Sequence, residues 1–152
     1  MITIGDILLS KHILLDLESR TQAKAIAKVA ELLESDNRVK DWERLDAGLL
    51  PGSACMANGS GSGICIAHLR TDAVSAMIMG VGRSMVGIPG DDGTRIRLVF
   101  VIGVPVALAS DYLRIIGALA RIFRSEKGET ALLKAQTAEE FLETLCTLEM
   151  EM

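Results

Sequence analysis

The sequence predicts an α/β domain in which a mixed β-sheet is flanked by helices on both sides. Three observations support this fold class: helical periodicity at both ends of the chain, short strand-like segments in the middle, and close spacing between those segments. Parallel neighbours need a long crossover connection, and the strands follow one another too closely for every pair to have one. We therefore expect a mixed sheet rather than an all-parallel one.

Length and composition limit the classes of protein to consider. The chain has 152 residues, of which 49% are hydrophobic, so we expect residues 1–152 to form one domain with its own core. A net charge of −4 and only 3% aromatic residues argue against nucleic-acid binding. Cys55, Cys65 and Cys146 lie far apart in the sequence and show no C-x-x-C spacing. This spacing predicts free thiols in a reducing compartment, without a metal or a cofactor.

The chain also lacks the sequence features of membrane and secreted proteins. Its longest apolar run, residues 98–109, is shorter than the ~18–20 residues that a bilayer span needs and contains Pro105. The N-terminus has an early Asp6 and no basic segment before an apolar stretch, which argues against a signal peptide. We therefore expect a cytoplasmic protein that has no membrane partner.

The first long helix is expected near residue 20. Residues 19–22 have the form of a capping box, in which the Ser19 hydroxyl caps the helix and the Gln22 amide returns a hydrogen bond. Apolar residues then recur at helical spacing, which predicts an amphipathic helix of roughly four turns: Ala23, Ile26, Val29, Ala30 and Leu33. A second helix is expected over residues 39–50, and Pro51 stops it.

The middle of the chain has the character of strands. Residues 53–63 are mostly small and are interpreted as a loop. Short apolar segments bounded by turn residues predict three strands: residues 64–69, 73–79 and 84–88. The turn signal at residues 89–93 predicts a hairpin between the flanking strands. Residues 98–104 are apolar without alternation, which indicates a strand covered on both faces.

The last third of the chain is predicted to be helical again. Ser110 is expected to cap a helix with an apolar face and an outer row of arginines: Leu113, Ile116, Ala120 and Phe123 inside, and Arg114, Arg121 and Arg124 outside. Residues 137–140 form a second capping box, which predicts a final helix after Thr137.

His68 is the candidate for chemistry, because it ends a predicted strand directly behind the glycine-rich loop. Side chains alternate along a strand, so Arg70 is expected to project to the same side as His68. A neutral imidazole can accept a phosphoryl group while an arginine and loop amides stabilise the charge on its oxygens. On the residues alone, a structural histidine bonded to the backbone is the favoured interpretation. His12 is interpreted as a surface or strand-edge histidine.

Nucleotide binding is poorly supported. A phosphate-binding P-loop leads into a helix, whereas residues 58–63 lead into a predicted strand and no Gly-Lys-Ser/Thr follows. Beside His68 the sequence shows no second histidine and no paired carboxylate, and no Ser-His-Asp arrangement is readable at this spacing. A hydrolase or a metalloenzyme is therefore disfavoured, and a small-molecule sensor that uses the glycine loop is the weakest alternative.

The segment from Gly61 to His68 reads Gly-Ser-Gly-Ile-Cys-Ile-Ala-His, and Arg70 follows it closely. It resembles the active-site segment of the enzyme IIA domains of the bacterial phosphotransferase system. The resemblance is to the fructose/mannitol type, which includes the nitrogen-regulatory IIA proteins and in which the segment reads approximately Gly-Asn-Gly-Ile-Ala-Ile-Pro-His. It extends over nearly the whole chain. It implies the family's compact domain, with a mixed sheet flanked by helices.

The resemblance also implies a function. His68 would accept a phosphoryl group from HPr or an HPr-like carrier protein, which would make the chain a phosphotransferase. His68 would then pass the group to an enzyme IIB cysteine, or the phosphohistidine would act as a regulatory signal toward a target protein. We expect four residues to support the phosphoryl group: Asn58, Ser62, Arg70 and Tyr112. The absence of a fused IIB or IIC segment favours a free-standing regulatory role over direct sugar transport.

The sequence departs from the family pattern at several positions around this histidine. Ala67 replaces the usual proline, Gly52-Ser53 stands where an Arg-Glu pair is usual, and Asn58 replaces a threonine. Tyr112 occupies the position of a second histidine, and a phenol can donate a hydrogen bond but cannot carry positive charge. The alternative function is therefore a non-phosphorylated IIA-like regulatory module that binds a partner protein.

Overall fold

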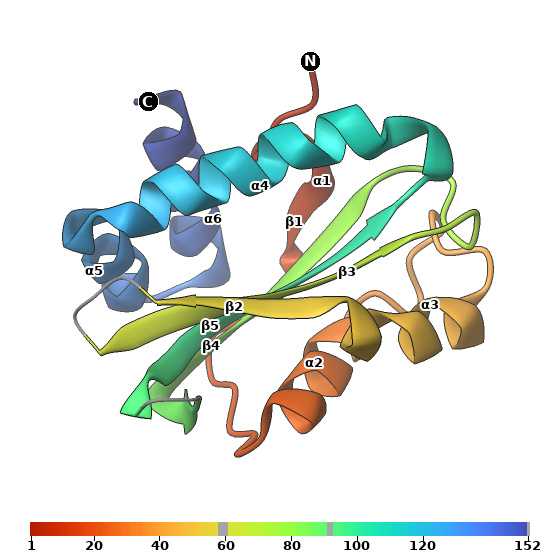
Figure 1. Ribbon diagram of the computed structural model, residues 1–152. Helices are drawn as coiled ribbons and strands as arrows, with labels where there is room; N and C mark the ends of the chain where they lie inside the picture. The colour runs from red at the N-terminus through yellow and green to blue at the C-terminus, as the bar shows by residue number, and fades with distance from the viewer. Residues whose placement is uncertain (58–60, 91–92, 152) are drawn as a thin grey trace.

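The computed structural model describes residues 1–57, 61–90 and 93–151, and a mixed five-stranded sheet lies at its centre (Figure 1). The strands are β1 (Leu8–Leu14), β2 (Ser53–Ala57), β3 (Ser62–Arg70), β4 (Ile78–Pro89) and β5 (Arg95–Val104). Their order across the sheet is β1-β4-β5-β3-β2. The β1–β4 and β3–β5 pairs are parallel, whereas the β4–β5 and β2–β3 pairs are antiparallel. The predicted mixed sheet is confirmed.

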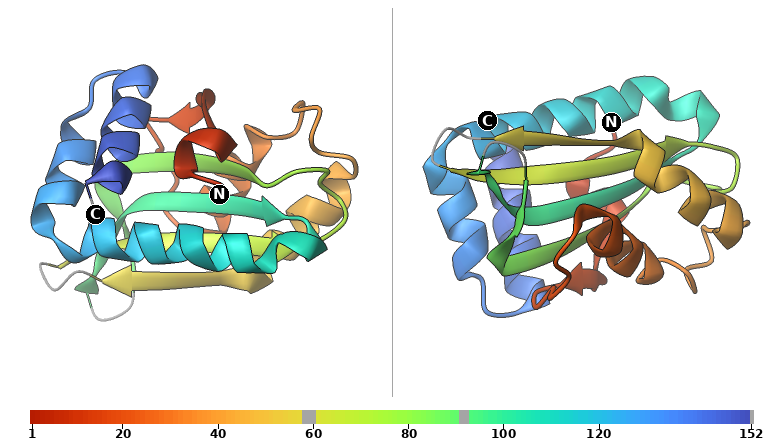
Figure 2. Two further views of the ribbon diagram at one scale, coloured as in Figure 1. Left: turned by 90° about the horizontal axis from the view of Figure 1, so that it is seen from above. Right: turned by 60° about the horizontal axis from the view of Figure 1, so that its bottom comes forward.

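Helices cover both faces of the sheet (Figures 1 and 2), as the sequence predicts. One face carries α1 (Ile4–Ile7), α4 (Ala109–Arg124), α5 (Glu126–Lys134) and α6 (Ala138–Met150). The other face carries α2 (Gln22–Glu31) and α3 (Trp42–Leu49). The described residues also form the short 3-10 helices η1 (Leu50–Gly52) and η3 (Val106–Leu108). Among the helices in the described ranges, none combines the length and the apolar character that crossing a membrane requires.

The central strand β5 connects the two halves of the core. Phe100 and Ile102 point into the cluster under α4, whereas Val99 and Val101 point into the cluster under α2. All four side chains are fully buried. A strand with helices on both faces needs apolar residues at every position, and this explains why the segment lacks alternation.

Two strand predictions need correction. Residues 53–57 form β2 rather than a loop, and β2 pairs with β3 from Ser53–Ala67 to Ala57–Gly63. Residues 84–88 belong to β4, which is one long strand whose register with β5 shifts between Arg83 and Ile88. The predicted strand over 73–79 contributes only its last two residues to β4. The predicted hairpin is confirmed, because β4 and β5 pair as antiparallel neighbours.

Three predicted helix starts can be compared with the structure. The cap of α2 is Thr21, whose hydroxyl accepts a hydrogen bond from the Lys24 amide at 3.2 Å, so Ser19 was placed two residues too early. Ser110 lies inside α4 and does not cap it. Thr137 is confirmed as the cap of α6, since its hydroxyl accepts a hydrogen bond from the Glu140 amide at 3.0 Å.

The predicted inner face of α4 is partly wrong. Leu113 is 68% exposed, whereas Phe123 is buried as predicted. The buried face of the helix is made by Ile115, Ala118, Leu119, Ile122 and Phe123. The three arginines are exposed, as expected. The exposed Leu113 lies near His68, so its position bears on the site described below.

His12 is buried, which corrects the expectation of a surface histidine, although it does lie in β1, an edge strand of the sheet, as the strand-edge interpretation predicts. Only 2% of the residue is exposed, and its Nε2 lies 3.5 Å from the Oδ2 of Asp36. Asp36 also accepts hydrogen bonds from the Arg38 backbone amide and from Arg38 Nε, both at 2.9 Å. Burial lowers the pKa of His12, and the Asp36 carboxylate only partly opposes this effect. The hydrogen bonds from Arg38 lower the pKa of Asp36 to about 2.

These shifts predict that the protein loses stability as the pH falls. In the unfolded chain His12 takes up a proton near its ordinary pKa of 6.5, whereas in the native state its pKa is lower. The contribution of His12 to the free energy of unfolding is therefore complete above this pH and declines below it. The contribution of Asp36 is lost later, as the pH falls from 3.8 toward about 2. We expect the urea midpoint to fall between about pH 7 and about pH 5. The variant His12→Gln should lack this decline, and an equal decline in both proteins would contradict the assignment.

Candidate functional site

His68 lies near the carboxyl end of β3, just beyond the hydrophobic core. Ile64 and Ile66 point into the cluster under α4, so strand alternation places His68 and Arg70 on the same face. His68 is half-buried, and Arg70 is exposed. Because β3 and β5 are parallel, the chain that leaves β5 at Val104 turns into α4 at the same end of the sheet.

Tyr112, in the first turn of α4, stacks on the imidazole of His68. The two ring centroids are 4.6 Å apart and the planes differ by 24°. This stacking restricts the rotation of the imidazole, so the nitrogens on its edge keep a defined orientation. Burial raises the pKa of Tyr112 to about 12, so the phenol stays protonated and can donate a hydrogen bond.

An open pocket of about 270 Å³ lies beside this ring pair. Its lining residues are His68, Arg70, Val104, Ala109, Tyr112 and Leu113. The amino-terminal end of α4 borders the pocket, and its N-cap residue Leu108 makes no side-chain capping bond. The amide groups and the positive end of a helix dipole attract anions. The pocket therefore combines an imidazole, a guanidinium, a phenol and a helix amino terminus, a combination suited to a phosphoryl group.

Gly52 packs against the main chain of His68 from the neighbouring segment. A Cβ atom built at this position would overlap the carbonyl oxygen of His68. Ser53 pairs with Ala67, so β2 begins directly after this close approach. The absence of a side chain at position 52 therefore allows the edge strand to lie against the end of β3.

Adding a side chain at position 52 should damage this site. In Gly52→Arg, and in the smaller Gly52→Ala, the new Cβ forces the backbone away from His68. We expect a loss of about 1–3 kcal/mol in the free energy of unfolding, measured by urea denaturation.

Gly117→Ala is the matched control, because a Cβ there meets only the end of the Arg121 side chain. This helical substitution should be neutral or slightly stabilising. If Gly52→Ala is as stable as the unmodified protein, the close packing at His68 is not required.

The structure brings together some of the predicted site residues and separates others. Arg70 and Tyr112 line the same pocket as His68. Ser62 begins β3, six residues before His68, which corresponds to about 20 Å along a strand. The expectation that Ser62 donates a hydrogen bond to a phosphoryl group on His68 is therefore corrected. Ser62 lies at the amino-terminal end of β3, whereas His68 lies near the carboxyl end of the same strand. Asn58 lies outside the described residues.

Sequence reasoning missed two features of the site. The first is the amino terminus of α4, for which Pro105 and the helical run behind it provided a signal. The second is exposed apolar surface at the pocket and just before α4: Leu113 is 68% exposed and Val106, in η3, is 49% exposed. Exposed apolar side chains around an open reactive group are typical of surfaces that contact another protein.

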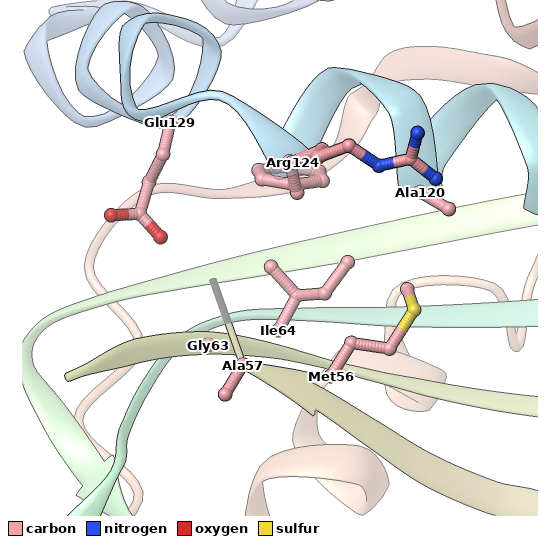
Figure 3. A pocket seen from close by; sticks show the side chains of 8 residues that line it. Met56, Ala57, Gly63, Ile64, Ala120, Arg124 and Glu129 are labelled. Carbon is pink, nitrogen blue, oxygen red and sulfur yellow. The ribbon is translucent and has the colours of Figure 1, made fainter. Parts of the chain in front are cut away.

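A second pocket, of about 200 Å³, lies away from this site near the opposite end of β3 (Figure 3). Its lining residues are Met56, Ala57, Gly63, Ile64, Ala120, Phe123, Arg124 and Glu129. Its floor is largely apolar, with Ile64 and Met56 facing α4 in the close view. This pocket does not include His68, so the histidine site and the second pocket are separate features of the fold.

Comparisons with known proteins point to a single family. The family model of the phosphoenolpyruvate-dependent sugar phosphotransferase system, EIIA 2, matches residues 6–147. A fructose-specific EIIA component of the phosphotransferase system from Haloferax volcanii is 35% identical over 119 residues, which cover 77% of each chain.

Solved structures with a similar fold come from the same system. The nitrogen regulatory protein IIA-Ntr from Neisseria meningitidis aligns with a TM-score of 0.79 at 25% identity, and the alignment covers 93% of this chain and 98% of that one. Enzyme IIA of the mannitol system from Escherichia coli, solved in complex with phosphorylated enzyme IIB, aligns with a TM-score of 0.71 at 17% identity. That alignment covers 93% of this chain and 99% of the other.

Proposed function

The chain belongs to the EIIA 2 family of the phosphoenolpyruvate-dependent sugar phosphotransferase system, and we propose that it is a histidine phosphocarrier with His68 as the phosphoryl acceptor. The observation that carries this proposal is the half-buried imidazole at an open pocket, stacked on Tyr112 and flanked by Arg70. A buried histidine such as His12 is closed to a partner protein, whereas His68 is open to one.

The reaction is a transfer between two nucleophiles. A neutral nitrogen of His68 attacks the phosphorus of a phosphohistidine on the donor protein, the new N–P bond forms, and the donor's N–P bond breaks. The other ring nitrogen of the donor carries a proton, so the donor leaves as a neutral imidazole, and the phosphorylated His68 ring keeps its own N–H proton until solvent removes it. Arg70 and the amino terminus of α4 stabilise the negative oxygens, and Tyr112 positions the ring.

We infer that the donor is an HPr-like carrier protein and that the acceptor is an enzyme IIB cysteine or a regulatory target protein. The support for enzyme IIB is the mannitol IIA relative, which was solved in complex with phosphorylated enzyme IIB. The support for a regulatory role is the fold similarity to IIA-Ntr. The exposed Leu113 and Val106 provide apolar surface against which such partners can pack.

Incubation with enzyme I, HPr and labelled phosphoenolpyruvate tests the proposal. We expect the full chain to take up close to one label per molecule, and the label to be lost in acid, as expected for a phosphohistidine. Omission of HPr should abolish the uptake. An unlabelled protein in a mixture that phosphorylates a known IIA domain would contradict the phosphocarrier function.

Specific residues favour one alternative, a non-phosphorylated regulatory module that uses the same surface for binding. Gly52, Ala67 and Tyr112 replace residues that are usual around the family's histidine, which leaves Arg70 as the cation that lines the pocket. This alternative predicts that the chain binds HPr or a target protein and acquires no label in the same mixture.

Tyr112 should affect the rate of phosphoryl uptake through its stacking on His68. The variant Tyr112→Ala loses the ring contact, worth about 0.5–1.5 kcal/mol, and should slow labelling by up to about tenfold. Tyr112→Phe keeps the stacking and loses only the hydroxyl. Its labelling rate should therefore lie between that of Tyr112→Ala and that of the unmodified chain. Initial rates of labelling measure the difference. Equal rates for Ala and Phe would contradict a positioning role for the ring.

A further inference from the structure

Two of the three cysteines lie directly opposite each other in the sheet, although the sequence places them ten residues apart. Cys55 of β2 pairs with Cys65 of β3, and the two strands are antiparallel. Directly opposed residues in such a pair have Cα atoms about 4.5–5.5 Å apart. Disulfide bonds span Cα separations of about 4.4–6.8 Å, so this register suits a cross-strand bond. All three cysteines are free thiols in the structure, as the sequence predicts, but the sheet brings these two together.

The side chains of this pair meet on the face of the sheet that α2 covers. Cys65 is fully buried in the cluster under α2, and the Nε2 of Gln22 lies 3.7 Å from its sulfur. The same nitrogen also donates a hydrogen bond to the sulfur of Cys55. One amide group therefore contacts both thiols, which shows that the two sulfurs converge rather than point to opposite faces.

The two thiols differ in access. Cys55 is exposed and lines a pocket of about 240 Å³, whereas Cys65 lies behind it. A small oxidant can therefore reach Cys55 first. Burial and the neighbouring Cys55 raise the pKa of Cys65, so Cys65 is the less reactive of the two thiols. It is expected to react only after Cys55 has been oxidised.

We propose that Cys55 and Cys65 form an oxidation site that a hydroperoxide converts into an intrachain disulfide. The Cys55 thiolate attacks one peroxide oxygen, the O–O bond breaks, and the released hydroxide takes up a proton, which leaves a sulfenic acid on Cys55. The sulfur of Cys65 then attacks the sulfur of Cys55, and the S–O bond breaks. The departing hydroxyl leaves as water with the proton of Cys65. Two thiols and one hydrogen peroxide thus give one disulfide and two waters.

The disulfide would tie the edge strand β2 to β3 close to the phosphoryl site. Cys65 lies three residues before His68 on the same strand, and Gly52 lies three residues before Cys55. Oxidation would therefore fix covalently the strand pair whose end holds His68. The oxidation site itself does not depend on the proposed phosphocarrier function, because its chemistry requires only the two sulfurs.

Hydrogen peroxide treatment of the reduced full-length chain tests this proposal. We expect the number of free thiols to fall from three to one, with a single intrachain disulfide that peptide mapping assigns to Cys55 and Cys65. The readout is the thiol count and the map, so its failure is distinguishable from a failure to accept phosphate. Retention of three thiols, a disulfide that contains Cys146, or a disulfide between two chains would overturn the proposal.

Three serine variants provide the matched controls. Cys146→Ser should give the same disulfide in the same yield, since Cys146 lies in α6, apart from the β2–β3 pair. Cys55→Ser should reduce the disulfide yield to background. Cys65→Ser should stop at a sulfenic acid on Cys55, which dimedone traps. Cys65→Ala, which replaces the buried thiol with an apolar group, repeats this test if the serine variant does not fold. Full disulfide formation in either Cys65 variant would contradict the assignment.

Discussion

A His68→Ala variant is expected to lose the acid-labile phosphoryl label completely, in a mixture where the unmodified chain approaches one label per molecule. Alanine has no nitrogen that can attack phosphorus, and neither Arg70 nor Tyr112 is a nucleophile toward a phosphohistidine. The loss should leave the fold intact, because His68 is only half-buried and lies near the end of its strand. Circular dichroism and the urea midpoint check the fold, and initial labelling rates check the activity.

His12 provides the control for this experiment, because the chain contains only two histidines. The ring of His12 is buried beside Asp36, so it is closed to a donor protein. His12→Gln should therefore keep its label in proportion to the fraction of folded protein. If His68→Ala keeps a substantial label, another residue accepts the phosphoryl group and the proposed site is wrong.

Replacing Arg83 with methionine is expected to produce the largest loss of stability among the single substitutions considered. Arg83 is 7% exposed, and its Nη1 donates to the carbonyl oxygens of Leu132 at 3.0 Å, Leu133 at 3.3 Å and Ala135 at 2.6 Å. Its Nε also donates to the carbonyl oxygen of Leu15 at 3.3 Å. One side chain thus joins β4 to the end of α5 and to the segment after β1.

Methionine fills much of the same volume but removes the arginine donor from these carbonyl groups, of which Leu132 keeps the Ala135 amide as a donor. An unpaired buried polar group costs about 1–3 kcal/mol, so the loss of several of these hydrogen bonds should cost about 3–5 kcal/mol in total. We expect a loss of this size in the free energy of unfolding, measured by urea denaturation. The exposed Arg121→Met is the control and should change it by less than about 0.5 kcal/mol. A comparably small change for Arg83→Met would show that the network contributes little.

The parts of the fold that local patterns define were predictable. The strand around Phe100 is apolar on both faces because helices cover both faces, and that requirement is visible in the sequence alone. The Thr137 cap is predictable for the same reason, since a cap depends on residues three positions apart. The mixed sheet was predictable because the strands follow one another too closely in the sequence for every neighbouring pair to be parallel.

Features that depend on distant contacts were not predictable from local patterns. β2 consists of small residues such as Ser53 and Ala54, and only its pairing with β3 makes it a strand. His12 is buried beside Asp36, a residue that follows α2 and that only the fold brings against β1. The network of Arg83 joins segments about fifty residues apart, and the opposition of Cys55 and Cys65 likewise requires the β2–β3 register.

The residues of the candidate site likewise include some that local patterns predict and others that depend on distant contacts. The resemblance of the segment around His68 identified the histidine, and strand alternation correctly placed Arg70 on its side. The stacking of Tyr112 depends on how α4 returns over the sheet, so only the family's pattern pointed to that position. Ser62 was misplaced because a glycine-rich segment beside a histidine in sequence was expected to lie beside it in space, whereas an extended strand separates them.

Nitrogen-detected NMR of the two imidazole rings tests the central claim most directly. The spectra of His68 and His12 can be followed separately as enzyme I, HPr and phosphoenolpyruvate are added to the labelled chain. We predict that one ring nitrogen of His68 shifts to a phosphohistidine position and returns after acid treatment, while the signals of His12 stay unchanged. If the His68 signals do not move while HPr in the same tube becomes phosphorylated, His68 is not the acceptor and the phosphocarrier function is contradicted.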